Sequence, residues 1–242
     1  MIKRLFLFFL IAILFGLGSL ILGFVVFPVS EIFSKSSKTH KTRCVKIVNI
    51  SWKFLVKMLE FSGIIDVYAD REISKIKNKI IVASHPSYID ILLLIAYIPN
   101  SLCLAKPSLL KNFIMKNIVK SLYITNDGTV EDFLNKSKSA LEDGFNVIIF
   151  PTGKRVDDGE DVHIHKGAAQ LAIKSGISIV PLKITTSEPF MMKNHSFFQL
   201  GKKIVHFDIK IQDEIVVESL KTPEITEIGL RNKICSIIKE KI

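Results

Sequence analysis

Cysteine is scarce in this chain of 242 residues, and the few cysteines present form no pattern known for metals or disulfides. Cys44, Cys103 and Cys235 are widely spaced, odd in number and include no Cys-x-x-Cys pair. This usage argues against a disulfide framework and against a cysteine zinc site. It agrees with a protein that works in a reducing compartment.

Motifs for nucleic-acid binding are also missing, although a net charge of +10 would suit an acidic partner. The sequence contains no zinc-finger spacing, no helix-turn-helix pattern and no aromatic-interleaved RNA motif. We therefore expect no nucleic-acid partner. The anionic headgroups of membrane lipids are a simpler counter-charge for the excess of lysine and arginine.

Charged side chains are absent from residues 5–27, where Leu, Ile, Phe and Val dominate. The run is long enough to cross a hydrocarbon core of about 30 Å. A cleaved signal peptide is disfavoured because the apolar region is too long and no small-x-small cleavage site follows it. The sequence predicts a membrane anchor over residues 1–30. It either spans the bilayer or re-enters it, since Gly16, Gly18 and Gly23 could bend the helix.

Basic residues favour the C-terminal side of this segment, with Lys3 and Arg4 before it and five after it: Lys35, Lys38, Lys41, Arg43 and Lys46. This excess predicts the inner (cytoplasmic) membrane, with the following domain on the cytoplasmic side. Residues 31–62 are interpreted as a basic linker and an amphipathic helix with apolar residues at Val48, Trp52 and Leu55. That helix either packs against the domain or rests in the headgroup layer.

Strand-like and helix-like segments alternate through residues 63–242. The expected strands are residues 64–69, 79–84, 102–106, 122–125, 146–150, 177–184 and 204–211. The expected helices between and after them are residues 88–97, 107–121, 129–143, 166–174 and 223–241. This alternation predicts an α/β domain with a mostly parallel central sheet flanked by helices. Its oligomeric state is left open.

His85 and Asp90 follow the second expected strand, at the edge where open α/β sheets bind ligands. Positions five apart lie about 140° out of phase on a regular helix, so the two would not meet there. They can meet if His85 precedes the first turn, with Pro86 at its tolerated first position. Asp90 would then orient one ring nitrogen and leave the other free to take a proton. The simpler alternative is a strand-end histidine beside a solvated helical aspartate.

A second polar cluster, residues 150–155, follows the strand expected at residues 146–150. Gly153 would let the backbone approach a ligand, while Lys154 and Arg155 supply positive charge. The guanidinium of Arg155 is a planar fork suited to phosphate or carboxylate oxygens. The simpler alternative is a strand-ending turn with solvated cations.

The block His85-Pro86-Ser87-Tyr88-Ile89-Asp90 resembles the His-x4-Asp motif of the glycerolipid (lysophosphatidic acid type, PlsC-like) acyltransferases. Residues 150–155, Phe-Pro-Thr-Gly-Lys-Arg, resemble the family's Phe-Pro-Glu-Gly-Thr-Arg, with Thr152 replacing Glu and Lys154 replacing Thr. Asn126 stands where the family's middle block ends in Arg. Two further stretches are similar to family segments: Lys166-Gly167-Ala168-Ala169 and Val180-Pro181-Leu182.

This resemblance implies a membrane-bound O-acyltransferase that moves a fatty acyl group from an acyl thioester to a lysophospholipid such as 1-acyl-glycerol-3-phosphate. The thioester would be carried by coenzyme A or by acyl carrier protein, and no cofactor or metal is implied. His85 would be the general base and Asp90 its orienting acid. The resemblance also implies a set of substrate-binding residues: Ser87, Thr152, Gly153, Lys154, Arg155 and Lys166.

The departures at Thr152 and Asn126 leave other functions open. One is an acyltransferase for an amino-lipid, glycolipid or polyene-type acceptor, and another is a catalytically idle lipid-binding membrane protein. A hydrolase that uses Ser87 is disfavoured because the chain has no Gly-x-Ser-x-Gly elbow. A zinc site of His163 and His165 is disfavoured because no third ligand is evident.

Overall fold

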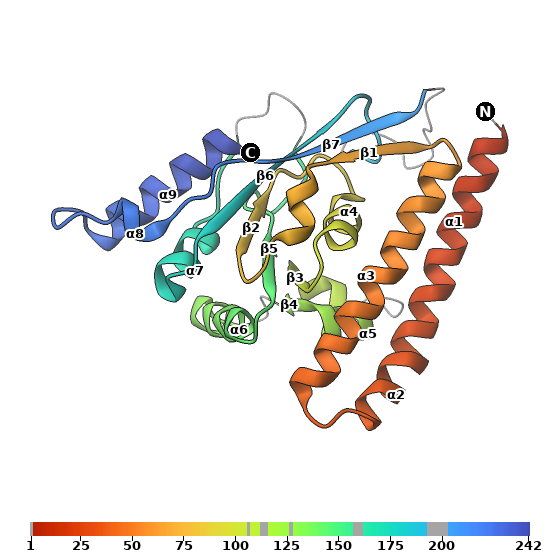
Figure 1. Ribbon diagram of the computed structural model, residues 1–242, viewed down its shortest axis with the longest axis horizontal. Coiled ribbons are helices and arrows are strands. Elements are labelled where there is room, and N and C mark those ends of the chain that lie inside the picture. Colours follow the sequence, from red (N-terminus) through yellow and green to blue (C-terminus); the bar gives the residue numbers. More distant parts are fainter. Residues whose placement is uncertain (1, 106, 112–115, 126–127, 157–161, 193–202) are drawn as a thin grey trace.

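A seven-stranded sheet forms the centre of the protein in a computed structural model that describes residues 2–105, 107–111, 116–125, 128–156, 162–192 and 203–242 (Figure 1). The strand order is β1-β7-β6-β2-β5-β3-β4. The strands are β1 (Ile65–Ala69), β2 (Ile80–Ala83), β3 (Ser101–Ala105), β4 (Tyr123–Thr125), β5 (Asn146–Ile149), β6 (Ile179–Thr186) and β7 (Val205–Ile211). Only the β6–β7 pair is antiparallel among these neighbours. The predicted α/β fold with a mostly parallel sheet is therefore confirmed.

The central strands consist mainly of apolar residues, and helices cover both of their faces. Every residue of β2 and of β5 is buried, as expected for a parallel sheet between helical layers. Ile81 of β2 lies in register with Ile148 of β5 on one side and with Val180 of β6 on the other. Since β2 and β5 are parallel neighbours, the loops that follow them emerge at the same edge of the sheet.

Helices flank this sheet on both sides (Figure 1). They are α4 (Asp90–Tyr97), α5 (Lys116–Leu122), α6 (Val130–Glu142), α7 (Gly167–Ser175), α8 (Val217–Leu220) and α9 (Glu227–Lys241), with 3-10 turns η2 (Arg71–Lys75) and η3 (Pro107–Lys111). The expected capping of α6 is present, since Thr129 Oγ1 accepts from the Asp132 amide and the Asp132 carboxylate accepts from the Thr129 amide. The expected end of α7 at Gly176 is also present, with φ of +70°.

Within residues 107–121, where one helix was expected, the structure describes η3 and α5, and residues 112–115 between them lie outside the described residues. At the start of α5, the Asn117 side chain donates a hydrogen bond to the Gly23 carbonyl over 3.0 Å. This contact joins segments far apart in the sequence, so helical periodicity does not predict it. A β-carbon on Gly23 would lie 3.2 Å from Asn117 Cβ, so the absence of a side chain permits this close approach.

The N-terminal segment Ile2–Ile32 is helical throughout and is long and apolar enough to cross a membrane by length and composition. It comprises α1 (Ile2–Ile21), a π-helical turn η1 (Leu22–Val26) and α2 (Phe27–Ile32). Helix α3 (Ser37–Phe61) follows and runs beside α1 (Figure 1). It begins at residue 37, where a polar linker was expected, because Ser36 caps its N-terminus.

One face of α3 packs against the domain, which is one of the two roles considered for it. Val48, Trp52 and Leu55 on this face are buried, and α3 packs against α4. The buried Asn49 side chain donates to the Ile95 carbonyl over 2.6 Å. Helix α3 is thus part of the domain, and it in turn supports α1.

Candidate active site

His85 and Asp90 form a hydrogen-bonded pair at the carboxyl edge of the sheet. The chain leaves β2 at Ala83 and enters α4 only at Asp90, so His85 lies before the first helical turn, as the spacing argument requires. His85 Nδ1 is 2.8 Å from Asp90 Oδ2, and the Ser87 amide donates to the same oxygen over 2.7 Å. Asp90 therefore orients the imidazole with Nδ1 as donor.

The carboxyl group of Asp90 is fully buried. Burial raises its pKa above the ordinary value, whereas the His85 ring, the Ser87 amide and the nearby Arg155 guanidinium act in the opposite direction. The second oxygen, Oδ1, has no hydrogen-bond partner within the part of the chain that the structure describes. A carboxylate at this position can stabilise a positive charge that develops on the His85 ring when Nε2 takes a proton.

The other face of the His85 site is open to a groove. The imidazole stacks on the Phe150 ring, with centroids 4.1 Å apart and planes 22° apart. The His85 side chain is 19% exposed and lines the groove. Because the described residues provide a hydrogen bond to Nδ1 but none to Nε2, Nε2 is the nitrogen that can exchange a proton with a substrate.

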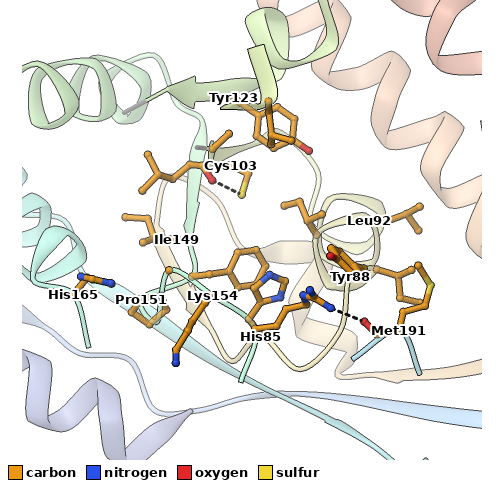
Figure 2. Close-up of a pocket in the computed structure, with 18 of the residues that line it drawn as sticks. His85, Tyr88, Leu92, Cys103, Tyr123, Ile149, Pro151, Lys154, His165 and Met191 are labelled. Atoms are coloured by element: carbon orange, nitrogen blue, oxygen red, sulfur yellow. Dashed lines mark hydrogen bonds between the residues drawn. The ribbon is translucent and has the colours of Figure 1, made fainter. Parts of the chain in front are cut away.

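The groove itself is large and mainly apolar, with a volume of about 1640 Å³. One wall comes from α1 and α3, through Phe8, Phe15 and Trp52. The far end is formed by residues of β3 and β4, including Cys103 and Tyr123 (Figure 2). Such a cavity suits a long hydrocarbon chain that passes the His85 ring.

The turn after β5 is held by its own backbone. Gly153 has φ of +63°, its amide donates to the Phe150 carbonyl over 3.1 Å, and the His165 amide donates to the Pro151 carbonyl over 2.8 Å. A β-carbon at Gly153 would lie 3.0 Å from His165 Nε2, so glycine is required for both conformation and space. The Gly153 amide is thus engaged within the turn, which differs from the expectation that it contacts a ligand.

Thr152 is buried, and its hydroxyl donates to the Lys154 carbonyl over 2.6 Å rather than facing the groove.

Three positive side chains line the groove: Arg155 and the exposed Lys154 and Lys166. His165 lines it as well, and Lys166 lies immediately before α7. Lys154 and His165 lie on one side of His85, while Tyr88 and Met191 lie on the other (Figure 2). Among the described residues that line the groove there is no aspartate or glutamate. The sequence-predicted residues Gly153, Lys154, Arg155 and Lys166 are therefore brought together, but Thr152 is not.

Ser87 is also turned away from the groove. Its side chain is buried, and its hydroxyl donates to the Phe190 carbonyl over 2.7 Å. This geometry does not agree with Ser87 as a substrate ligand or as a hydrolase nucleophile.

His163 and His165 are exposed, with ring centroids 5.3 Å apart. The residues described include no group of three His, Cys, Asp or Glu side chains that could hold a metal ion.

Two residues that the sequence did not single out, Tyr88 and Met191, hold Arg155. The Arg155 guanidinium carbon lies 3.3 Å from the centre of the Tyr88 ring, and Nη1 donates to the Met191 carbonyl over 3.2 Å. Met191 has a left-handed φ of +52°, a conformation that costs a non-glycine residue about 1–2 kcal/mol. Tyr88 stands inside the His-x4-Asp block, but Met191 lies in an irregular stretch with no sequence signal.

A histidine backed by a buried carboxylate, beside an apolar groove lined by lysine and arginine side chains, has the groups needed to exchange a proton with an amphipathic, anionic ligand. Comparison with known proteins identifies the family. The model of the family described as Acyltransferase matches residues 64–185. The chain belongs to this acyltransferase family, as its motifs predicted.

Two curated relatives are similar over part of their length. A 1-acyl-sn-glycerol-3-phosphate acyltransferase of Borreliella burgdorferi is 29% identical over 139 residues, which cover 54% of this chain and 55% of that protein. The human 1-acyl-sn-glycerol-3-phosphate acyltransferase beta is 25% identical over 177 residues, which cover 67% of this chain and 61% of that protein. The matches thus span between half and two thirds of these relatives.

The fold is similar to that of a solved structure over nearly the whole chain. The crystal structure of the 1-acyl-sn-glycerophosphate (LPA) acyltransferase PlsC from Thermotoga maritima superposes with a TM-score of 0.71. The superposition covers 99% of this chain and 95% of that chain, at 21% sequence identity. The similarity includes the N-terminal helices as well as the α/β domain.

Proposed function

We propose that the protein is a membrane-attached O-acyltransferase that moves a fatty acyl group from an acyl thioester to the hydroxyl of a lysophospholipid such as 1-acyl-glycerol-3-phosphate. The observation that carries this proposal is the His85–Asp90 pair, whose free imidazole nitrogen lines an apolar groove that lysine and arginine side chains also line. Family membership and the names of the two curated relatives support the same reaction.

In the proposed mechanism His85 acts as a general base without a covalent enzyme intermediate. Nε2 takes the proton of the acceptor hydroxyl while its oxygen attacks the thioester carbonyl carbon. The tetrahedral intermediate then collapses, the carbon–sulfur bond breaks, and Nε2 returns the proton to the departing thiolate. Asp90 stabilises the transient imidazolium through the 2.8 Å hydrogen bond at Nδ1.

The two substrates of this reaction would both bring anionic groups to the groove. The acceptor carries a phosphate, and the phosphopantetheine arm of coenzyme A or of acyl carrier protein carries another. Arg155 lies against the Tyr88 ring, and Lys154 and His165 lie on the other side of His85 from Tyr88 (Figure 2). We infer that the Tyr88 side receives the acceptor and that the other side, with Lys166, receives the donor.

We also propose that α1 attaches the protein to one leaflet and does not cross the bilayer. Its N-terminal end contacts the domain where Arg4 donates to the Lys203 carbonyl over 2.8 Å, and the stretch beyond its C-terminal end contacts α5 through Gly23. A helix held along the domain at both ends can cross a bilayer only by pulling the domain into hydrocarbon. Its outward face is apolar: Phe6, Leu10, Ile13, Leu17 and Ile21 are between 48% and 66% exposed. The basic residues of α3 favour the cytoplasmic leaflet, whose anionic lipids attract them.

Two experiments test this attachment. Ile13→Lys should reduce co-flotation with anionic vesicles, whereas Ile228→Lys on the exposed face of α9 should not. A cysteine replacing the exposed Ile2 should react with an impermeant maleimide from the same side as the domain. Protection of that cysteine until the vesicles are opened would show that α1 crosses the bilayer.

Acyl transfer is tested by incubating the purified protein with an acyl thioester and a panel of lysolipids and by identifying products by mass spectrometry. The panel includes amino-lipid, glycolipid and polyene-type acceptors, because Thr152 replaces the family's Glu; Asn126, the other departure, lies outside the described residues. His85→Ala should abolish turnover. The matched control is His206→Ala, since His206 forms an exposed pair with Asp66 on β7 and β1. Lipid binding without turnover on any acceptor would favour the catalytically idle alternative.

A further inference from the structure

We propose that the Tyr88 ring and the Met191 carbonyl form a clamp that fixes the Arg155 guanidinium for a phosphate monoester headgroup. Tyr88 is then a positioning residue that sets the headgroup selectivity of the groove. The inference rests on the proposed acyltransferase function only for the identity of the lipid. The clamp itself follows from the contacts of these three residues.

Arg155 is held on one face and at one edge. Its guanidinium carbon lies 3.3 Å from the Tyr88 ring centre, which is a cation–π contact, and Nη1 donates to the Met191 carbonyl over 3.2 Å. A free arginine side chain samples many rotamers and loses that freedom when it binds a ligand. Because the clamp restricts the guanidinium beforehand, less of this entropy is lost on binding.

The Met191 carbonyl is itself fixed, so the clamp has a rigid base. The Tyr88 amide donates to this carbonyl over 3.3 Å, and the left-handed φ of Met191 turns the backbone at this point. The preceding residue, Phe190, accepts the Ser87 hydroxyl hydrogen bond and packs edge-on against Phe8 of α1 with ring centroids 6.3 Å apart. The clamp thus joins the loop before α4, the turn after β5 and the chain after β6.

The N–H groups of Arg155 that remain free of described partners favour a phosphate monoester as the ligand. The described residues engage one of its five N–H groups. The amide of the next residue, Val156, donates to the His85 carbonyl over 3.0 Å, which places Arg155 beside the His85–Asp90 pair. A phosphate monoester offers oxygens that match this planar fork. A phosphocholine headgroup brings a cation, and the described lining of the groove contains no carboxylate to pair with it.

The chain contains a built-in reporter for testing the clamp, because its only tryptophan, Trp52, lines the groove. Binding of lysophosphatidic acid, lysophosphatidylcholine and monoacylglycerol of one chain length is measured by Trp52 fluorescence in detergent micelles. Tyr88→Leu removes the aromatic face, Tyr88→Phe keeps it, and Tyr68→Leu changes an equally exposed tyrosine on β1.

Tyr88→Leu should raise the dissociation constant for lysophosphatidic acid about tenfold and leave that for monoacylglycerol unchanged. Tyr88→Phe and Tyr68→Leu should bind both lipids like the unmodified protein. In turnover assays Tyr88→Leu should raise KM for lysophosphatidic acid by a similar factor, with kcat within about threefold.

The binding measurement does not depend on acyl transfer, so the two proposals fail separately. Phosphate-dependent binding that Tyr88→Leu removes supports the clamp, even if no acceptor is acylated. The inference is overturned if Tyr88→Leu weakens both lipids equally, if Tyr88→Phe behaves like Tyr88→Leu, or if the unmodified protein does not prefer the phosphate-bearing lipid.

Discussion

Replacement of Asp90 by asparagine separates the catalytic role of this buried carboxyl group from its role in the fold. Asp90 Oδ2 accepts both hydrogen bonds, from His85 Nδ1 and from the Ser87 amide. The side-chain oxygen of the introduced asparagine can take that position and accept both, with its amide nitrogen where Oδ1 now lies. The His85 tautomer is then preserved, so the loss of the negative charge is the change that acts on the imidazole.

The size of the effect follows from that charge. Two unit charges about 4 Å apart, roughly the separation that the 2.8 Å hydrogen bond sets, interact by about 4 kcal/mol at an effective dielectric constant of about 20. This stabilisation of the imidazolium is present only when His85 has taken a proton. Its loss corresponds to a fall in kcat of about 10³-fold, within the range expected for general acid–base catalysis.

The melting temperature should stay nearly unchanged, in contrast to kcat. Burial raises the pKa of Asp90, which means that the fold disfavours the ionised carboxyl group relative to the unfolded chain. A neutral amide of the same shape avoids this cost, but its N–H groups lie where Oδ1 has no hydrogen-bond partner among the described residues, which offsets the gain. A loss of turnover without a loss of stability would therefore assign the carboxylate to chemistry.

The assay follows release of free thiol from an acyl thioester in the presence of lysophosphatidic acid, with thermal unfolding measured on the same samples. The matched control is Asp208→Asn on β7, a partly exposed aspartate paired with Lys210. The reasoning is refuted if Asp90→Asn lowers kcat less than about tenfold. It is also refuted if the variant loses turnover only because it unfolds at the assay temperature.

Three further predictions concern pH, Ser87 and the glycine turn. Because the folded-state pKa of Asp90 is raised above 3.8, its contribution to stability is fully present below about pH 3.8 and is lost as the pH rises through the folded-state pKa. The melting temperature of Asp90→Asn minus that of the unmodified protein should therefore increase from about pH 3.5 towards neutrality, and a constant difference would contradict this. Ser87→Ala should cost about 1–2 kcal/mol in urea unfolding, because the hydroxyl donates to the Phe190 carbonyl and accepts from the Ile89 amide, with turnover retained within about tenfold; complete loss of turnover would revive a serine nucleophile. Gly153→Ala should destabilise more than Gly176→Ala, because both glycines have left-handed φ but only Gly153 would place a β-carbon against His165; equal losses in urea unfolding would show that this contact has no energetic weight.

The pattern of residues close in sequence was sufficient to predict much of the fold. The apolar strands β2 and β5, the Thr129 cap of α6 and the Gly176 end of α7 depend on residues close in sequence. The pairing of His85 with Asp90 was predictable for the same reason, since it needs only a strand end and a delayed helix start.

Ser87 shows where this reasoning stops. It lies inside the motif and was expected to bind substrate, but its hydroxyl donates a hydrogen bond to the carbonyl of Phe190, more than 100 residues later in the chain. Thr152 was assigned to substrate in the same way and instead stabilises its own turn. A motif shows which residues stand near a site, whereas the direction of each side chain depends on neighbours from other segments.

The sequence by itself determined an apolar N-terminal helix, an α/β domain and a histidine with its carboxylate, because periodicity, turn residues and short spacings act over a few residues. Tertiary structure alone decided that α1 lies along the domain and lines the groove, and that Tyr88 and Met191 hold Arg155. Those contacts join segments that meet only when the sheet brings its loops to one edge. Their energy comes from packing and hydrogen bonds between residues far apart in the sequence, and the order of residues along the chain does not show which of them meet.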